Sequence, residues 1–156
     1  MSDKKEESFG IFTGVKDLPV KLLSGDSFLP TKNNESDAAF DLYYSGDYIE
    51  IPAGTRVSLP TGIAMEIPEG YAGLIWPRSG MSVKQGVDVL AGVVDCGYRG
   101  EIVVCLLNTS SSHITIRRGD KVAQMVIQEV PRFVVKQVDE LSQSDRGDKG
   151  FGSSGR

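Results

Sequence analysis

The chain has 156 residues, of which 40% are hydrophobic and 24% are charged, and these values predict one globular domain with a modest core. Its net charge of −4 argues against a general nucleic-acid-binding protein, because neutralising a phosphate backbone requires a basic surface. We therefore expect no nucleic-acid partner, and we expect any anionic ligand to be bound by a few local cations.

The N-terminal segment, MSDKKEESFG, is too polar for a signal peptide. No apolar run approaches the roughly 18 residues that a membrane span requires. The two cysteines, Cys96 and Cys105, provide neither a disulfide framework nor the spacing of a zinc site. These features predict a flexible segment at residues 1–17 and a reduced, intracellular protein that does not bind membranes. We expect it in the cytoplasm or the nucleus, encoded by a cell or by a virus.

Short apolar segments separated by turn-forming residues predict an all-β fold. Apolar residues alternate along 63–67 and 113–116, as in half-buried strands. The segment 101–107, EIVVCLL, is apolar on both faces, which predicts a strand buried on both sides, with its cysteine in the core. Strands of about five residues with a turn every 8–12 residues are typical of a sandwich or barrel. Only Ser79–Gly86 has the pattern of a short helix, ended by a glycine.

Two stretches in the first half of the chain contain polar residues that packing does not explain. Asp41 lies in the apolar segment DAAFDLYY, where a buried carboxylate needs an arginine, a metal ion or a metal-bound water as its partner. The segment WPRSGM places Arg78, Ser79 and Gly80 at the start of the predicted helix, and backbone amides there, with a nearby guanidinium, suit a phosphate. A structural salt bridge and an ordinary capped turn are the alternatives.

The segment AGVVDCGYRGE contains a candidate catalytic carboxylate, Asp95. Two valines precede it, which predicts partial desolvation and the ability to accept a proton from water. The following Cys-Gly pair predicts a turn before Tyr98. We expect a hairpin that presents backbone groups to the edge of a planar ligand while Tyr98 covers one side. The alternative is a hairpin in which Asp95 only caps the turn.

The tetrapeptide RGDK occurs twice, at 118–121 and 146–149, with different flanks. The first copy leads into VAQMVIQEV and predicts a turn before a strand in which Gln124 is the polar exception. The second leads into GFGSSGR, whose glycines do not support a strand. This tail combines an arginine, an aromatic ring, serine hydroxyls and accessible backbone amides. Such a combination suits a terminal phosphate and a lid that orders when ligand binds.

His113 is the single histidine, and its position in a predicted loop indicates a solvated side chain. A Ser-His-Asp triad is therefore not expected, and the sequence contains no P-loop, HExxH or EF-hand pattern. Chemistry in this chain would depend on carboxylates, backbone amides, arginine or a metal ion.

Five of these segments together resemble the five ordered motifs of the trimeric, all-β dUTP pyrophosphatase (dUTPase) family. In chain order they are AAFDLYY, PRSG, AGVVDCGYRGE, RGDKVAQ and RGDKGFGSSG. The resemblance implies a jelly-roll β domain at 18–140 with one short helix after PRSG. It also implies a homotrimer with shared active sites, in which a C-terminal arm at 141–156 closes the site of a neighbouring subunit.

The resemblance implies that the chain hydrolyses dUTP to dUMP and pyrophosphate with Mg²⁺ as cofactor, which keeps uracil out of DNA and supplies dUMP for thymidylate synthesis. Asp95 matches the carboxylate that activates water for in-line attack on the α-phosphorus, and Arg146 is the second catalytic residue. Tyr98 matches the ring that packs on deoxyribose and rejects UTP, and Asp41 would hold waters on Mg²⁺. The other implied contacts are Arg78, Ser79, Gly80, Gln124, Gly152, Ser153 and Ser154 with the phosphates, and Leu90, Gly92, Val93, Val94 and Phe151 with uracil.

The chain departs from the usual family pattern at Ala39, Trp76, Leu90 and the pair Cys96-Gly97. None of these departures removes a proposed catalytic group, and Leu90 is the one that bears on the uracil contacts. Two other functions fit the same fold: a regulatory or interaction protein, and a dCTP deaminase. The deaminase usually has a glutamate in an Arg-Ser-Ser context, whereas this chain has PRSGMS.

Overall fold

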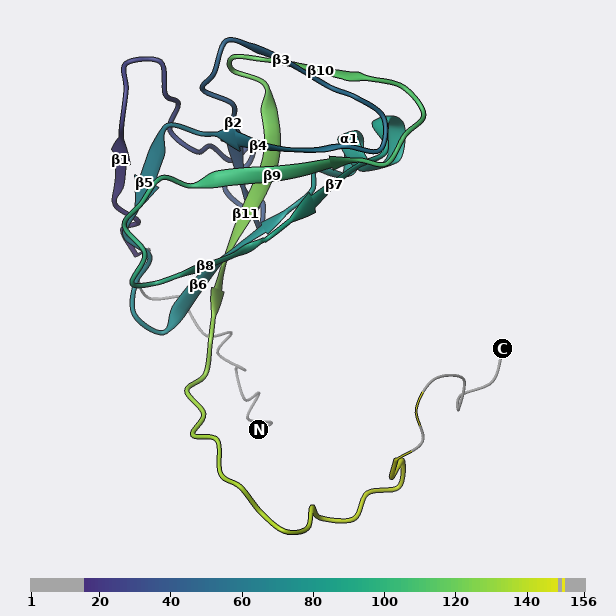
Figure 1. The fold of residues 1–156 in the computed structure, drawn as a ribbon. Helices are drawn as coiled ribbons and strands as arrows, with labels where there is room; N and C mark the ends of the chain where they lie inside the picture. Colours follow the sequence, from purple (N-terminus) through teal and green to yellow (C-terminus); the bar gives the residue numbers. More distant parts are fainter. Residues whose placement is uncertain (1–15, 149, 151–156) are drawn as a thin grey trace, which may run out of the picture.

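The computed structural model describes residues 16–148 and 150, which form a β domain with one short helix and a long C-terminal extension (Figure 1). All strand pairs in this part of the chain are antiparallel. The elements are β1 (Val20–Leu22), β2 (Phe40–Tyr43), β3 (Tyr48–Ile51), β4 (Arg56–Pro60), β5 (Ile63–Met65), β6 (Tyr71–Trp76), α1 (Ser79–Gln85), β7 (Val87–Leu90), β8 (Val93–Asp95), β9 (Val103–Asn108), β10 (Ile114–Arg117) and β11 (Lys121–Glu129).

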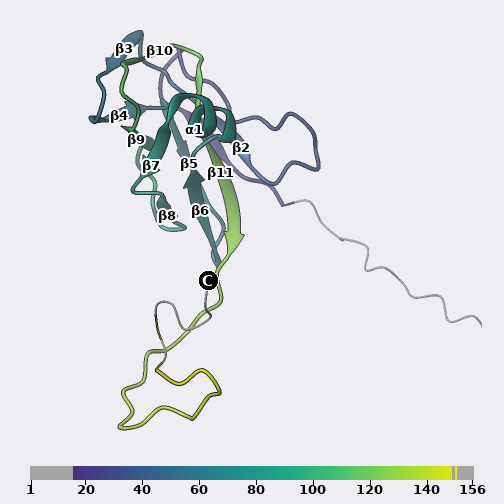
Figure 2. The same cartoon turned by 90° about the vertical axis from the view of Figure 1, so that its right-hand side faces the viewer.

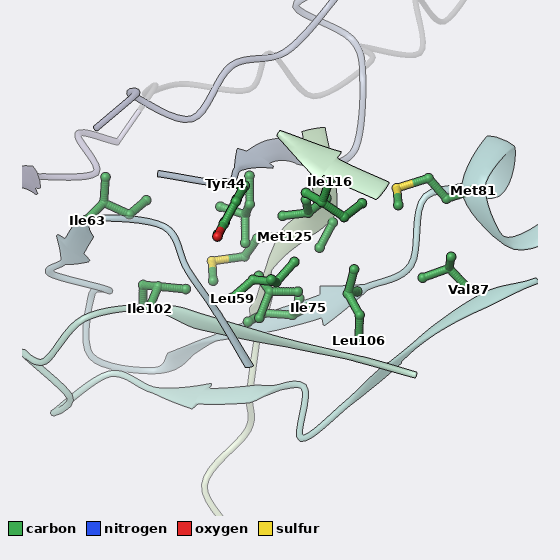
Figure 3. Close-up of a cluster of buried hydrophobic side chains, with 14 of the residues drawn as sticks. Tyr44, Leu59, Ile63, Ile75, Met81, Val87, Ile102, Leu106, Ile116 and Met125 are labelled. Atoms are coloured by element: carbon green, nitrogen blue, oxygen red, sulfur yellow. The ribbon is translucent and has the colours of Figure 1, made fainter. Parts of the chain in front are cut away.

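Two sheets pack against each other around the hydrophobic core. One has the strand order β2-β11-β6-β8 and the other has the order β4-β9-β7. Figure 3 shows Ile75 and Met125 from the first sheet gathered with Leu59 and Leu106 from the second. Burying each of these side chains contributes roughly 1.5–3 kcal/mol relative to leaving it exposed. The strand pairs β1-β5 and β3-β10 lie at the margins of the domain, and the predicted all-β, jelly-roll architecture is confirmed.

The helix α1 lies between β6 and β7 and ends as its sequence predicted. Gly86 adopts the left-handed conformation (φ 66°), and its N–H bonds to the carbonyls of Met81 and Ser82. Met81 is buried and joins the helix to the core (Figure 3). The PRSG segment is thereby held at the end of β6. Among the described residues, no helix is long and apolar enough to cross a membrane.

The strand β9 is buried on one face only, so the prediction that both faces are buried is wrong for a single chain. Val104 and Leu106 are fully buried, whereas Val103 is 42% exposed and Cys105 and Leu107 are partly exposed. The reason is that, among the described residues, no second layer covers the outer face of the β4-β9-β7 sheet. Cys105 is therefore not a core residue of the single chain.

Residues 130–148 leave the β domain at the end of β11 and form no helix or strand (Figures 1 and 2). Pro131 cannot donate a backbone hydrogen bond, which disfavours continuation of the strand. Phe133, Val134 and Val135 are 85%, 95% and 97% exposed. Contiguous apolar side chains with this exposure are typical of a surface that binds a partner.

Candidate active site

Asp41, Gln124 and Trp76 form a row across three adjacent strands of the four-stranded sheet. Gln124 on β11 lies opposite Asp41 on β2 and opposite Trp76 on β6. Directly paired residues project to the same face of a sheet, and all three side chains line one cavity of about 680 Å³. Arg78, Ser79, Gly80 and Lys121 also line it. The structure therefore brings together every predicted residue of the first, second and fourth motifs.

The carboxylate of Asp41 has two cationic partners at this cavity. Arg78 Nε lies 2.9 Å from Asp41 Oδ1, and Lys121 Nζ lies 2.7 Å from Oδ2. The Asp41 side chain is only 15% exposed, which explains why it needs charged partners. The hydrogen bond with Asp41 raises the pKa of Lys121 above its usual value. Asp37 also lines the cavity, so its two cations are balanced by two carboxylates. Arg78 and Lys121 nevertheless lie side by side, an arrangement suited to binding several phosphate oxygens.

Gln124 connects the strand β11 to the segment that carries Arg78. Its Nε2 donates a hydrogen bond to the Pro77 carbonyl at 2.9 Å. This contact satisfies the polar side chain within an otherwise apolar strand and fixes the position of the PRSG turn beside Asp41. The polarity of Gln124, which its sequence context left unexplained, thus has a positioning role at the cavity.

Asp95 and Tyr98 line a second cavity, of about 230 Å³, together with Val93, Val94 and Glu101. Asp95 is the last residue of β8 and lies opposite Ala72 on β6. Its side chain is exposed, so the predicted partial desolvation is wrong for a single chain. The predicted turn after Asp95 is confirmed, because the Tyr98 N–H bonds to the Asp95 carbonyl at 3.1 Å.

The hairpin predicted for AGVVDCGYRGE, with its turn at Cys96-Gly97, is wrong, because β8 pairs with β6 and not with β9, the strand that follows the turn. The connection before β8, from Leu90 to Val93, also joins strands that do not pair with each other. β7 pairs with β9 and β8 pairs with β6, so the connection passes from one sheet to the other. Ala91 has φ 55°, and a Cβ on Gly92 would lie 2.6 Å from the Ile75 carbonyl oxygen, so the turn is tight against β6. Gly92 lines a third cavity, of about 280 Å³, with Trp76 and Val93. Leu90 lines none of these three cavities.

The candidate residues of one chain thus fall into two separate places. The cavity around Asp41 and the cavity around Asp95 have no lining residue in common. Arg146 lies in a turn of the C-terminal extension, where the Gly147 N–H bonds to the Ser144 carbonyl, and it lines neither cavity. Phe151, Gly152, Ser153 and Ser154 lie outside the described residues.

Sequence reasoning missed two residues at the Asp41 cavity, Lys121 and Trp76. Lys121 and Gln124 are three positions apart, so strict strand alternation predicts that they project to opposite faces. The pairing of β11 with β2 shifts between Lys121 and Ala123, which is a β-bulge and brings both side chains to the cavity. Trp76 was noted only as a departure from the family pattern, although alternation along β6 places it on the Gln124 face.

Comparison with known proteins identifies the family of this chain. The dUTPase family profile matches residues 26–155. The deoxyuridine 5′-triphosphate nucleotidohydrolase of Mycolicibacterium gilvum is 47% identical over 146 residues, covering 88% of this chain and 94% of that protein. A mutant Staphylococcus bacteriophage 80alpha dUTPase, solved with dUpNHpp, has a TM-score of 0.85 at 30% identity and covers 91% of this chain and 100% of its own.

A mutant dUTPase from phage phi11 of Staphylococcus aureus, described with a structural Mg(II) ion, has a TM-score of 0.77 at 27% identity, covering 82% of this chain and 100% of its own. The similarity therefore extends over nearly the whole chain in both sequence and fold. Since the family profile spans all five motif segments completely, the chain belongs to the dUTPase family.

Proposed function

We propose that this protein is a dUTP diphosphatase that hydrolyses dUTP to dUMP and pyrophosphate. The main support is the Asp41 cavity, where Arg78 and Lys121 both lie within ion-pair distance of one carboxylate, in a chain 47% identical to a deoxyuridine 5′-triphosphate nucleotidohydrolase. A triphosphate carries close to four negative charges, and catalysis at phosphorus depends mainly on positioning and charge stabilisation. The side chains of this cavity would supply both the positioning and the charge stabilisation.

The phosphate chain would bind in the Asp41 cavity. Asp41 engages Arg78 through Nε, so the terminal guanidinium nitrogens are directed to the phosphate oxygens. Lys121 adds a second positive charge, and the residues after Arg78, Ser79 and Gly80, supply hydroxyl and backbone donors. Gln124 supports this segment through Pro77 and completes the polar wall.

The residues of this cavity fit Mg²⁺ as an ion carried by the nucleotide. Within residues 16–148 and 150, no three His, Cys, Asp or Glu side chains are grouped to hold a metal. Mg²⁺ commonly binds through substrate phosphates, one or two carboxylates and several waters. Asp41 lines the cavity and keeps lone pairs beyond its two ion pairs, so it would accept hydrogen bonds from metal-bound water. Bound Mg²⁺ would neutralise part of the phosphate charge.

Asp95 would be the general base that takes a proton from the water attacking the α-phosphorus, and Arg146 would stabilise the outer phosphates. Tyr98 would pack on the deoxyribose and exclude a 2′-hydroxyl. Backbone groups of 92–94 would contact uracil, with Phe151 covering it. Leu90 would contribute at most through its main chain, because its side chain lines none of the three cavities at this edge of the fold.

The active protein would be a homotrimer with shared sites, each combining the Asp41 cavity of one chain, the Asp95 cavity of a second and the C-terminal arm of a third. Three features support sharing: the two cavities are separate within one chain, the outer face of β9 is uncovered, and the arm presents nearly fully exposed apolar residues. We propose residues 18–140 as the β domain, 1–17 as a segment preceding it, and 141–156 as the closing arm.

The activity is tested by measuring pyrophosphate release from dUTP, UTP, dTTP and dCTP, with and without Mg²⁺. We expect release from dUTP in the presence of Mg²⁺ and far slower release from the other three nucleotides. Ammonia release from dCTP without pyrophosphate would identify a deaminase instead. A pure, folded sample that is inert towards dUTP with Mg²⁺ would disprove the proposal and favour a regulatory role.

A further inference from the structure

The loop between β8 and β9 follows Asp95 and carries Tyr98. At the far end of this loop, the Glu101 carboxylate fixes the loop to the domain. Glu101 Oε1 accepts a hydrogen bond from the Gly62 backbone N–H at 2.8 Å, in a partly buried position. Glu101 lines the same cavity as Asp95 and Tyr98. Nothing in the water-attack mechanism above uses this carboxylate.

The point to which Glu101 attaches is buried and held by hydrogen bonds to neighbouring strands. Thr61 and Ile102 are each 1% exposed. The Thr61 hydroxyl donates to the Ile102 carbonyl, and the Ile102 N–H donates to the Ile63 carbonyl at 2.8 Å. Gly62 itself is buried with φ 68°, and a Cβ there would lie 2.1 Å from Ser27 Oγ, so this turn requires glycine.

The main chain of Glu101 in turn holds Tyr98. The Tyr98 hydroxyl donates to the Glu101 carbonyl at 3.0 Å. A Cβ at position 100 would lie 2.4 Å from the Tyr98 hydroxyl oxygen, so Gly100 lets the ring fold back over its own loop. Gly62 holds the Glu101 side chain, and the Glu101 carbonyl in turn holds the Tyr98 hydroxyl. The side chain of Glu101 therefore fixes the carbonyl that orients the ring.

We propose that Glu101 is a positioning residue that sets the orientation of the Tyr98 ring, and thereby the preference for deoxyribose over ribose, by its hydrogen bond to the Gly62 N–H. This inference rests on the proposed dUTP hydrolysis, in which Tyr98 contacts the sugar. Without the carboxylate acceptor the Gly62 N–H is left buried and unpaired, which favours a displaced loop. Displacement of a substrate-contacting group by about 1 Å can reduce turnover about 10²-fold.

Two substitutions at this position separate the hydrogen bond from the charge. Glu101→Gln keeps an acceptor oxygen at the same chain length, whereas Glu101→Ala removes it. We expect Glu101→Ala to lower kcat/KM for dUTP and to reduce the dUTP/UTP ratio of kcat/KM about tenfold or more. Glu101→Gln should retain a ratio close to that of the unmodified protein.

Glu66→Ala is the matched control, because Glu66 also contacts this loop, at 3.5 Å from Arg99, but in an exposed ion pair that contributes little. Its dUTP/UTP ratio should be unchanged, and a change equal to that of Glu101→Ala would overturn the proposal. So would an unchanged ratio in Glu101→Ala, or a ratio in Glu101→Gln as low as in Glu101→Ala. If the alanine variant fails to fold by thermal melting, Glu101→Asp, with its shortened reach, replaces it and should show the lowered ratio.

The unmodified protein is assayed in the same experiment. Absence of dUTP hydrolysis there would refute the proposed function itself, whereas activity in the unmodified protein with an unaltered ratio in Glu101→Ala would refute only the role of Glu101.

Discussion

Asp41 illustrates how a single, largely buried carboxylate can hold two cations in place beside a cavity. Its ion pairs hold Arg78 and Lys121 side by side, although two like charges would otherwise repel. In the proposed function, an approaching triphosphate would meet two positioned cations, and little side-chain entropy would remain to be lost on binding. At the residue scale, the polar exceptions in the sequence were informative: Asp41, Arg78 and Gln124 were identified by their chemistry and meet in one cavity.

Lys121 was not identified because a local irregularity determines its direction. A β-bulge shifts the side-chain alternation, and no pattern in the sequence of β11 marks the position of that bulge. The exposure of Asp95 was also mispredicted, because two neighbouring valines indicate burial only if their strand is covered. Val93 is 70% exposed in the single chain.

Replacing Asp95 tests the proposed general base. Asp95→Asn preserves the shape of the side chain but removes its ability to accept a proton, so kcat should fall about 10²–10⁴-fold. Because the side chain is exposed and has no ion pair with another residue that the structure describes, folding and nucleotide affinity should change little. Steady-state kinetics with dUTP, together with the dissociation constant for dUMP, provide the measurement, and near-normal turnover would contradict the assignment.

At the scale of elements, alternation and turn residues predicted the helix α1, the strand β10 and the turn before β11, because these features depend on neighbouring residues. The connection between β7 and β8 could not be predicted in this way. Its path between two sheets depends on the close approach of Gly92 to Ile75, which are 17 positions apart in the chain. Burial of the outer face of β9 depends on whether another layer packs on it. The sequence of β9 alone does not indicate whether such a layer is present.

Removing the end of the C-terminal extension tests its role as a closing arm. A chain that stops after Asp145 keeps every strand and the helix, so it should remain folded with the same oligomeric state. It lacks Arg146 and the glycine- and serine-rich tail, so dUTP turnover should fall strongly through lost phosphate binding and lost closure over the nucleotide. Circular dichroism and size-exclusion chromatography serve as the control, and undiminished turnover in this shortened chain would rule out the arm.

At the scale of the whole molecule, the separate cavities predict that defective chains can complement each other. Asp95→Asn and Arg78→Ala should each yield an inactive protein. If the two cavities belong to different subunits of one site, mixed oligomers made by joint refolding will contain some sites in which both Asp95 and Arg78 are intact.

Activity should therefore reappear in the mixture of the two variants but not in either variant refolded alone. The measurement is dUTP hydrolysis by the co-refolded sample, with unrefolded variants combined just before the assay as the control. If each site drew both residues from the same chain, every site in the mixture would carry a defect, and the mixture would stay inactive.

If the sites are shared between subunits as proposed, the enzyme would be sensitive to its own abundance. A chain released by dilution would carry the Asp41 cavity but would lack the base and the arm that its neighbours would provide. Specific activity would then decline at low protein concentration, as mass action requires of any function that exists only in the assembled state. In a cell making few copies, the supply of subunits would limit turnover before the supply of nucleotide did.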